Sequence, residues 1–186
     1  MPIGEPMNAE PVEHYRPLPS LGWLWVLALA IAMVVPMTAA LFAEPIPAEA
    51  LAIIIGTYAL IGVIVVWFLV TIAFFPRMRY DLTSDALVIT YGPILRYALP
   101  YASITDVRIE NLRFSPWSSF RFPGLALWKV QYGGGIGIVK MCSTRSHRGV
   151  VLIAAGGERY GISPDEQDRF IHELDSRRSR AREGGR

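Results

Sequence analysis

The chain has 186 residues and a formal net charge of +2, and 52% of its residues are hydrophobic. That hydrophobic fraction is high for a water-soluble domain, and the single cysteine excludes an intramolecular disulfide framework. The length allows one domain of ordinary size in addition to membrane-spanning segments.

Two long apolar segments follow a mostly polar leader, residues 1–20. Residues 21–43 and residues 50–75 contain no charged side chain, and each segment exceeds the roughly 20 apolar residues that cross a bilayer as a helix. A cleaved signal peptide would have a shorter apolar core and a basic start, whereas this leader has three acidic residues and one arginine. The sequence therefore predicts a two-span transmembrane helical hairpin over residues 21–75.

The charges beside the apolar segments predict an orientation. The connecting loop, residues 44–49, carries two acidic residues and no basic residue, whereas Arg77 and Arg79 follow the second segment directly. Basic residues beside membrane spans favour the cytoplasmic side. We therefore expect an integral protein of the cytoplasmic membrane, with a cytoplasmic leader and both termini in the cytoplasm.

Small residues within the spans are candidates for helix packing. Ala28 and Ala32 are four residues apart, as are Ala52 and Gly56. This spacing lets two helices approach closely in lipid, although Ala and Gly are common in membrane helices for other reasons. Neither span contains an ionisable side chain, so we expect the hairpin to be an anchor rather than an ion or proton path.

After Pro76 the hydrophobic pattern changes from a helical to an alternating period. Segments rich in β-branched and aromatic residues are separated by turn-forming residues, and this pattern predicts a series of short strands. The predicted strands are residues 80–83, 86–91, 94–99, 104–112, 136–143, 148–154 and 158–162. Between them, residues 114–128 are predicted to be irregular.

A helix is predicted to close the domain. Ser163, Pro164 and Glu166 have the pattern of a capping box with proline at the first helical position. Phe170 and Leu174 belong to the apolar stripe that follows. The arginine-rich residues 177–186 are predicted to form a basic disordered tail.

Four stretches of this region resemble bacterial pleckstrin-homology-like domains of small membrane proteins, largely of unknown function, including the two-span peptide-immunity type. They read YDLT (80–83), LPYASI (99–104), RGVVLI (148–153) and YGISPDE (160–166). The resemblance implies a cytoplasmic α+β domain over residues 77–176. About seven antiparallel strands would form a small barrel capped by one C-terminal helix. These stretches contain no catalytic motif.

No segment predicts catalysis, a cofactor or a metal site. The glycines at 133–135 lack the spacing of a phosphate-binding loop, and the following Lys140 precedes no hydroxyl residue. His14, His147 and His172 are far apart and have no neighbours with metal-ligand spacing. We therefore expect a protein without enzymatic activity.

Basic and aromatic residues supply the candidate contact sites. All but one of the 18 Lys and Arg residues lie after residue 76. They would favour an anionic membrane surface, although positive-inside topology and solubility also explain them. The aromatic-rich residues 114–122 fit a segment folded onto the domain, one at the membrane interface or a partner site. The candidate partner or membrane contacts are Phe114, Trp117, Phe120, Arg121, Phe122, Lys140, Arg145 and Arg148.

These patterns predict a membrane-anchored, non-enzymatic binding module that recognises a protein or a peptide at the inner face of the membrane. Two alternatives remain open. One is a structural subunit of a larger membrane complex, and the other is a domain that senses anionic lipid headgroups. Nucleic acid is not an expected partner, because a tethered domain without a recognition helix offers little beyond charge.

Overall fold

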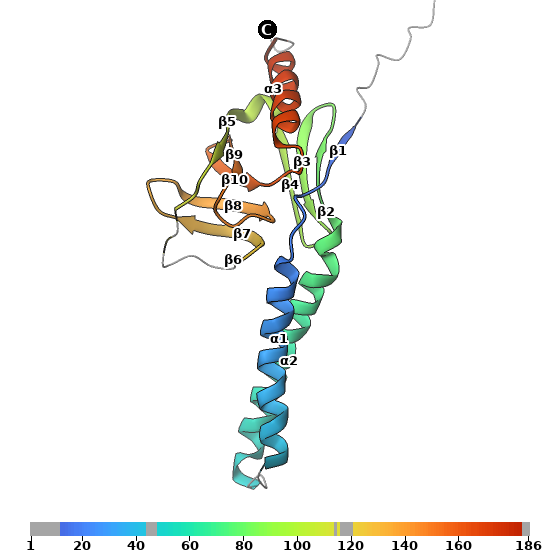
Figure 1. Cartoon of the computed structure of the whole chain (residues 1–186), viewed down its shortest axis with the longest axis vertical. Coiled ribbons are helices and arrows are strands. Elements are labelled where there is room, and N and C mark those ends of the chain that lie inside the picture. The colour runs from blue at the N-terminus through green and yellow to red at the C-terminus, as the bar shows by residue number, and fades with distance from the viewer. Residues whose placement is uncertain (1–11, 44–47, 114, 116–120, 184–186) are drawn as a thin grey trace, which may run out of the picture. The chain divides into compact units, whose positions relative to one another are not determined.

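The computed structural model describes residues 12–43, 48–113, 115 and 121–183. The chain divides into two compact units. One unit is Leu21–Pro76, and the other combines Met1–Ser20 with Arg77–Arg186. Figure 1 shows a helical hairpin in the first unit, and strands with one long helix in the second.

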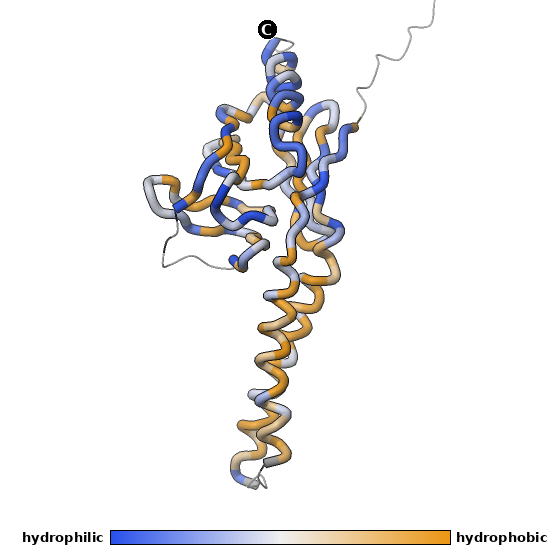
Figure 2. The backbone as a smooth tube through the Cα atoms, in the orientation of Figure 1, coloured by the Kyte–Doolittle hydropathy of each residue, from blue (hydrophilic) through white to orange (hydrophobic). Residues whose placement is uncertain are grey.

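The first unit consists of two long helices that lie side by side, α1 (Gly22–Ala43) and α2 (Leu51–Phe74). The short helix η1 (Ala48–Ala50) precedes α2, and η2 (Phe75–Arg77) follows it. Both long helices have the length and composition needed to cross a membrane. Hydrophobic residues predominate all along both helices in Figure 2, a distribution that suits an apolar environment around the hairpin.

A hydrogen bond between a side chain and the backbone joins the two helices. The Tyr58 hydroxyl on α2 donates a hydrogen bond to the Met37 carbonyl oxygen on α1, with 2.6 Å between the oxygens. Met37 follows Pro36, which lies inside α1 and contributes no N–H group to the helix. Because a bilayer core contains no water, a bond of this kind would stabilise the pairing of two membrane helices.

The four small residues predicted for helix packing lie outside this helix–helix contact. Ala28, Ala32, Ala52 and Gly56 are all exposed, and a Cβ atom added at Gly56 would have no atom within 4 Å. They therefore do not pack α1 against α2, because spacing alone does not decide which face of a helix meets its neighbour. Packing of these residues against another protein stays a prediction.

The second unit contains two sheets in the residues that the structure describes. The first sheet is antiparallel, with the order β1–β2–β3–β4. The second has the order β5–β9–β10–β8–β7–β6, and the short helix η3 (Tyr101–Ser103) connects the two sheets. The strands are β1 (Glu13–Tyr15), β2 (Met78–Leu82), β3 (Ala86–Tyr91), β4 (Leu95–Pro100), β5 (Ile104–Glu110), β6 (Arg121–Phe122), β7 (Leu125–Tyr132), β8 (Gly137–Ser143), β9 (Val150–Ala155) and β10 (Glu158–Ile162).

The expected barrel of about seven antiparallel strands is wrong in two details. The strands form two sheets rather than a closed barrel. In addition, β10 pairs with β9 in antiparallel fashion but with β8 in parallel, with Tyr160 opposite Lys140. A local hydrophobic pattern identifies a strand without identifying its partners, so this pairing was not predictable from periodicity.

The leader contributes β1, which the sequence analysis missed. His14 lies opposite Asp81 of β2, and Tyr15 is 5% exposed, with its ring edge-on to Phe170 at a centroid distance of 5.1 Å. Leu18 then donates its N–H to the Ser163 carbonyl oxygen at 2.8 Å. The segment before the hairpin is therefore built into the domain. A three-residue strand is too short to give a periodic signal.

The region predicted to be irregular contains β6 and the beginning of β7. Leu125, Ala126 and Leu127 are all buried, so the start of β7 lacks the alternation that marks a strand with one exposed face. Trp128 also has a φ angle of 60°, which is uncommon for a residue other than glycine. These two features explain why the strand was not recognised.

The C-terminal helix, α3 (Gln167–Glu183), begins later than predicted. Phe170 donates its N–H to the Glu166 carbonyl oxygen at 2.9 Å. Ser163 does not cap the helix, because its hydroxyl accepts a hydrogen bond from the Thr144 N–H at 2.8 Å. The predicted capping box is therefore wrong, although its residues lie immediately before the helix.

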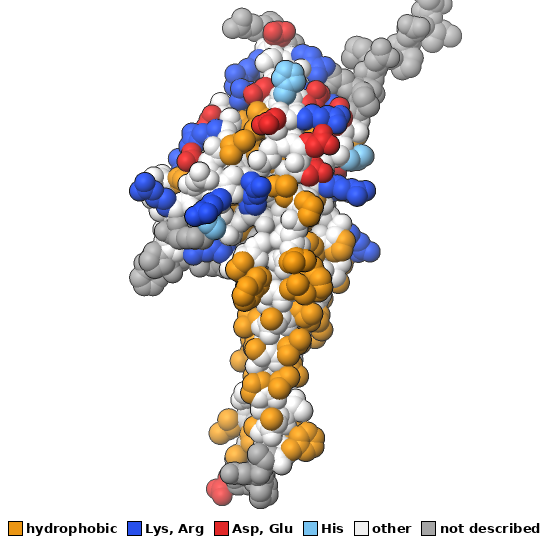
Figure 3. Space-filling view, viewed as in Figure 1, with side chains coloured by type: hydrophobic (Ala, Val, Ile, Leu, Met, Phe, Trp, Pro, Cys, Tyr) orange, Lys and Arg blue, Asp and Glu red, His pale blue; other side chains and the backbone are white. Residues whose placement is uncertain are grey.

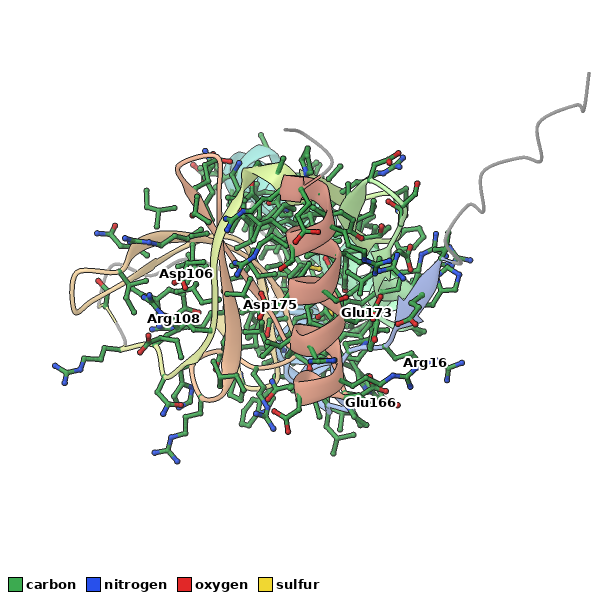
Figure 4. The ribbon with its side chains drawn as sticks, turned by 90° about the horizontal axis from the view of Figure 1, so that it is seen from above. Arg16, Asp106, Arg108, Glu166, Glu173 and Asp175 are labelled. Atoms are coloured by element: carbon green, nitrogen blue, oxygen red, sulfur yellow. The ribbon has the colours of Figure 1, made fainter. Side chains whose placement is uncertain are left out.

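The helix also continues through Glu183, so residues 177–183 are helical rather than a disordered tail. Arg177 is 4% exposed and its Nε donates to Glu173 at 2.7 Å. Its Nη1 donates to the carbonyl oxygens of Leu82 and Thr83 at 3.2 and 3.0 Å. Figure 4 looks down on α3 and shows it between the β5-containing sheet and the β1–β4 sheet, with Glu173 labelled.

Inside the core, Tyr80 of β2 connects the two sheets through a hydrogen bond. Its side chain is fully buried, and its hydroxyl donates to the Cys142 carbonyl oxygen of β8 at 2.8 Å. The Ser163 N–H donates to the same hydroxyl at 3.3 Å. Burial raises the pKa of Tyr80, so this hydroxyl remains a neutral hydrogen-bonding group.

Candidate ligand-binding groove

A groove of about 640 Å³ opens between two segments of the second sheet. One wall is residues 121–124, and the other is residues 144–149, which connect β8 to β9. Three arginines line the groove, Arg121 from the first wall and Arg145 and Arg148 from the second, together with His147. No acidic side chain is among the described residues that line it. We call this feature the basic groove.

The first wall is a tight turn between β6 and β7. Phe122 and Leu125 are paired, so Pro123 and Gly124 form the turn between them. Gly124 has a φ angle of 85°, a conformation that glycine adopts without steric cost. The Ser20 hydroxyl donates to the Gly124 carbonyl oxygen at 2.7 Å. The residue at the end of the leader therefore helps to fix this wall.

The base of the second wall is fixed by buried hydroxyl groups. Thr144 and Ser163 are both buried. The Ser163 hydroxyl oxygen lies 2.8 Å from the Thr144 nitrogen and 2.9 Å from the Thr144 hydroxyl oxygen. The Arg145 N–H donates to the Ser143 hydroxyl at 3.0 Å. Ser163, which was predicted to cap the C-terminal helix, therefore holds the base of this wall in place.

The remainder of this connection is held by four contacts from three other parts of the fold, which are the segment after β5, β7 and α3. Each contact involves a backbone N–H or carbonyl group, so the wall has little freedom to move independently of the domain. The contacts are Leu112 N–H to the His147 carbonyl oxygen (2.7 Å), Tyr132 hydroxyl to the Ser146 carbonyl oxygen, Gly149 N–H to Asn111 Oδ1 (2.9 Å) and Gln167 Nε2 to the Gly149 carbonyl oxygen (2.7 Å).

Gly149 allows Arg145 to fold back over the connection. Arg145 Nη1 donates to the Gly149 carbonyl oxygen at 3.3 Å. A Cβ atom at position 149 would collide with the Arg145 guanidinium group, and the φ angle of 59° at Gly149 is one that L-residues rarely adopt. Glycine is therefore required for this arrangement of the wall.

The electrostatic environment of the groove is positive. The pKa of His147 is lowered from its ordinary value, first by burial and then by the charges of Arg148 and Arg121. Burial raises the pKa of Tyr132 to about 12, an effect that the charge of Arg121 opposes. In Figure 3, Lys and Arg side chains gather over the part of the strand-rich unit that carries β6 to β8. This environment favours an anionic ligand.

The fold brings together four of the residues that the sequence analysis proposed as contacts. Arg121, Phe122, Arg145 and Arg148 all line the groove, although they come from two separate segments. Phe114, Trp117 and Phe120 lie outside the described residues.

Lys140, the remaining candidate, belongs to a different cluster. It forms an ion pair with Glu158, and its ammonium group lies 5.5 and 5.4 Å from the ring centroids of Tyr97 and Tyr160. The two rings meet edge-on at 5.3 Å. Hydrogen bonds from Lys140 and Tyr160 lower the pKa of Glu158. This cluster joins β4 to β8 and β10 rather than lining the basic groove.

His147 and the Pro123–Gly124 turn also line the groove, but neither was predicted from the sequence to belong to a site. His147 was considered as a metal ligand and rejected, but its position between Arg145 and Arg148 was a signal of a basic environment. The turn could not be assigned to a site, because it faces residues 144–149 only after β7 has paired with β8.

The described residues contain no group of three or more His, Cys, Asp or Glu side chains that could hold a metal ion. Cys142 is buried, and burial raises the pKa of its thiol. A protonated, inaccessible thiol is a poor nucleophile. The arginines that line the groove are side chains that can form hydrogen-bonded ion pairs with negatively charged groups.

The fold and the groove define a small PH-like domain that follows two apolar helices. Residues 78–178, more than half of the chain, match the family described as Bacterial PH domain, and the chain belongs to this family. This match confirms the resemblance noted from the sequence. The structure shows the predicted order of two apolar helices, a sheet-rich domain and a C-terminal helix. No curated protein and no solved structure matches the chain.

Proposed function

We propose that this chain is a non-enzymatic, membrane-anchored binding module whose basic groove recognises an acidic segment of a protein or peptide at the inner face of the cytoplasmic membrane. The observation that carries the proposal is the convergence of Arg121, Arg145 and Arg148 on one groove, with no acidic side chain among its described lining residues. The walls of the groove are fixed by backbone hydrogen bonds, so a ligand would not have to order them.

Arginine suits this role because its planar guanidinium group matches the two oxygens of a carboxylate. Arg145 and Arg148 are exposed, so an incoming carboxylate has access to them, and the half-buried Arg121 adds positive charge to the opposite wall. Phe122 and Pro123 also line the groove and give it apolar surface. These features favour a peptide segment that carries at least two acidic side chains next to an apolar one.

The anchor follows from the two apolar helices and from the pairing of β1 with β2. β1 precedes α1 and β2 follows α2, yet His14 lies opposite Asp81 in one sheet. If the hairpin spans a bilayer, both of its ends must therefore lie on the same side. Arg77 and Arg79 at the exit of the second helix favour the cytoplasm for that side.

The proposal is tested by crosslinking and capture of the full-length protein from its own membranes. The double variant Arg145→Gln/Arg148→Gln removes two charges from the groove without cutting a buried contact. The matched control, Arg96→Gln/Lys129→Gln, removes two exposed charges that do not line the groove. We expect capture of a partner protein to fall about tenfold in the groove variant, and to remain at the wild-type level in the control.

Other results would favour the alternative functions. Equal loss in both variants, with capture of anionic lipid instead of protein, would favour lipid sensing through general charge. Capture that is unaffected by either variant, but lost on replacing Ala28, Ala32, Ala52 and Gly56 by Leu, would favour a structural subunit that packs through its hairpin.

A further inference from the structure

We propose that binding of an acidic ligand in the basic groove is coupled to the uptake of a proton by His147, so that the groove binds more tightly as the pH falls from about 7.5 to about 6.0. This inference rests on the proposed function, because it concerns the same groove and the same class of ligand. It adds a regulatory property, which is sensitivity to mild acidification.

The position of His147 carries the inference. It lines the groove between Arg145 and Arg148 in sequence, and its backbone carbonyl is fixed by the Leu112 N–H at 2.7 Å. Its Nδ1 lies 3.1 Å from the Ser146 hydroxyl oxygen. Among the described residues that line the groove, it is the one whose ordinary pKa lies close to neutral pH.

The charged groups around His147 are basic on every described wall of the groove. Arg145 and Arg148 lie on its own connection, and Arg121 lies on β6 across the groove. Tyr132 of β7 donates its hydroxyl to the neighbouring Ser146 carbonyl oxygen and, with a pKa of about 12, stays neutral. In the unliganded protein, burial together with Arg148 and Arg121 keeps the pKa of His147 below its ordinary value.

An acidic ligand would oppose the lowering of the pKa of His147. Its carboxylates would pair with the guanidinium groups and place negative charge beside the imidazole, so the pKa of His147 would be higher in the complex than in the free protein. Well above both pKa values, the ring is neutral in each state and the affinity does not depend on its titration. As the pH falls through the pKa of the complex, the bound state takes up a proton first, so the affinity rises.

The test uses the full-length protein in detergent or lipid nanodiscs and a fluorescent hexaglutamate peptide as the probe. The dissociation constant is measured at pH 7.5, 6.5 and 6.0 at constant ionic strength. The peptide carboxylates stay ionised over this range, because the ordinary pKa of glutamate is about 4.3. We expect the wild-type protein to bind about fivefold more tightly at pH 6.0 than at pH 7.5.

Two histidine variants separate the proposed residue from the rest of the protein. In His147→Gln the ratio of the dissociation constants at pH 7.5 and pH 6.0 should fall from about five to about one, whatever the affinity of the variant at pH 7.5. His172→Gln changes an exposed histidine on α3, and this variant should keep the pH dependence of binding. Calorimetry at pH 6.5 in two buffers of different ionisation enthalpy should show proton uptake in the wild type and in His172→Gln, but not in His147→Gln.

The possible results distinguish failure of this inference from failure of the proposed function. Binding that requires Arg145 and Arg148 but is independent of pH, or a His147→Gln variant with the wild-type pH dependence, would overturn the proton coupling alone. Absence of binding at every pH, or binding that is unchanged in Arg145→Gln/Arg148→Gln, would overturn both.

Discussion

Arg177 illustrates how one side chain ties the C-terminal helix to the sheet. It is almost completely buried, and its guanidinium group bonds to Glu173 on the same helix and to the carbonyl oxygens of Leu82 and Thr83 at the end of β2. The Tyr101 hydroxyl also donates to the Thr83 carbonyl oxygen, at 2.6 Å. A buried charge with this many partners is costly to remove, because the Leu82 carbonyl oxygen and the Glu173 carboxylate each lose a donor.

We therefore predict that Arg177→Ala lowers the free energy of unfolding by about 3 kcal/mol. The matched substitution Arg180→Ala, at a side chain that is 51% exposed, should change it by less than about 0.5 kcal/mol. Chemical denaturation of the full-length protein in detergent, followed by tryptophan fluorescence, measures both values. Equal effects of the two substitutions would mean that the buried contacts of Arg177 contribute little.

The chemistry of single residues was partly predictable from the sequence. Arg145 and Arg148 were proposed as contacts from their charge and Arg121 as part of an aromatic-rich segment, and the fold places all three at one groove. Arg177 was assigned to a disordered tail, because a run of arginines resembles a solvated segment. Its partners at Leu82 and Thr83 are almost a hundred positions away in sequence, and local composition contains no information about them.

Among the elements, β1 is the strand that makes the leader part of the domain. Its residues precede the hairpin, but Tyr15 packs against Phe170. Ser20, later in the same leader, donates a hydrogen bond to Gly124 at the wall of the groove. The leader is therefore a structural part of the domain. This pairing is directly testable, because Cα atoms of opposite residues in an antiparallel ladder are about 4.5–5.5 Å apart, within the range that a disulfide bond spans.

We predict that the double variant His14→Cys/Asp81→Cys forms a disulfide bond in the full-length, membrane-inserted protein. The native Cys142 is buried and should not compete. The control, His14→Cys/Asp106→Cys, replaces a residue of β5 whose side chain is 48% exposed. Asp106 is labelled in Figure 4, and this variant should remain reduced under the same mild oxidant. Peptide mass spectrometry identifies the linked peptides. A disulfide bond in the control but not in the β1–β2 pair would contradict the observed register.

Some strands were predicted from the sequence more accurately than others. The strands β3 and β10 were predicted with the bounds that the structure shows, because they are flanked by clear turns. β7 was missed because its first three residues are all buried, and β1 because it is only three residues long. The parallel pairing of β8 with β10 depends on tertiary contacts, so no local pattern could have predicted it.

At the scale of the whole molecule, two apolar helices are inserted into the sequence of a PH-like domain. The domain closes around this insertion, with β1 on one side of it in sequence and β2 on the other. The basic groove lies entirely in the domain, on residues 121–124 and 144–149. We infer that the helices restrict the domain to a membrane and that the groove selects the partner found there.

The most direct test of this account is photocrosslinking from inside the groove. A benzophenone amino acid replaces Phe122, which lines the groove, or His172, which is exposed on α3, in the full-length protein in its own membranes. We predict a covalent adduct with a protein from position 122, none from position 172, and loss of the adduct in Arg145→Gln/Arg148→Gln. Equal adducts from both positions, or an adduct from position 122 that is insensitive to the arginine substitutions, would contradict recognition by the basic groove.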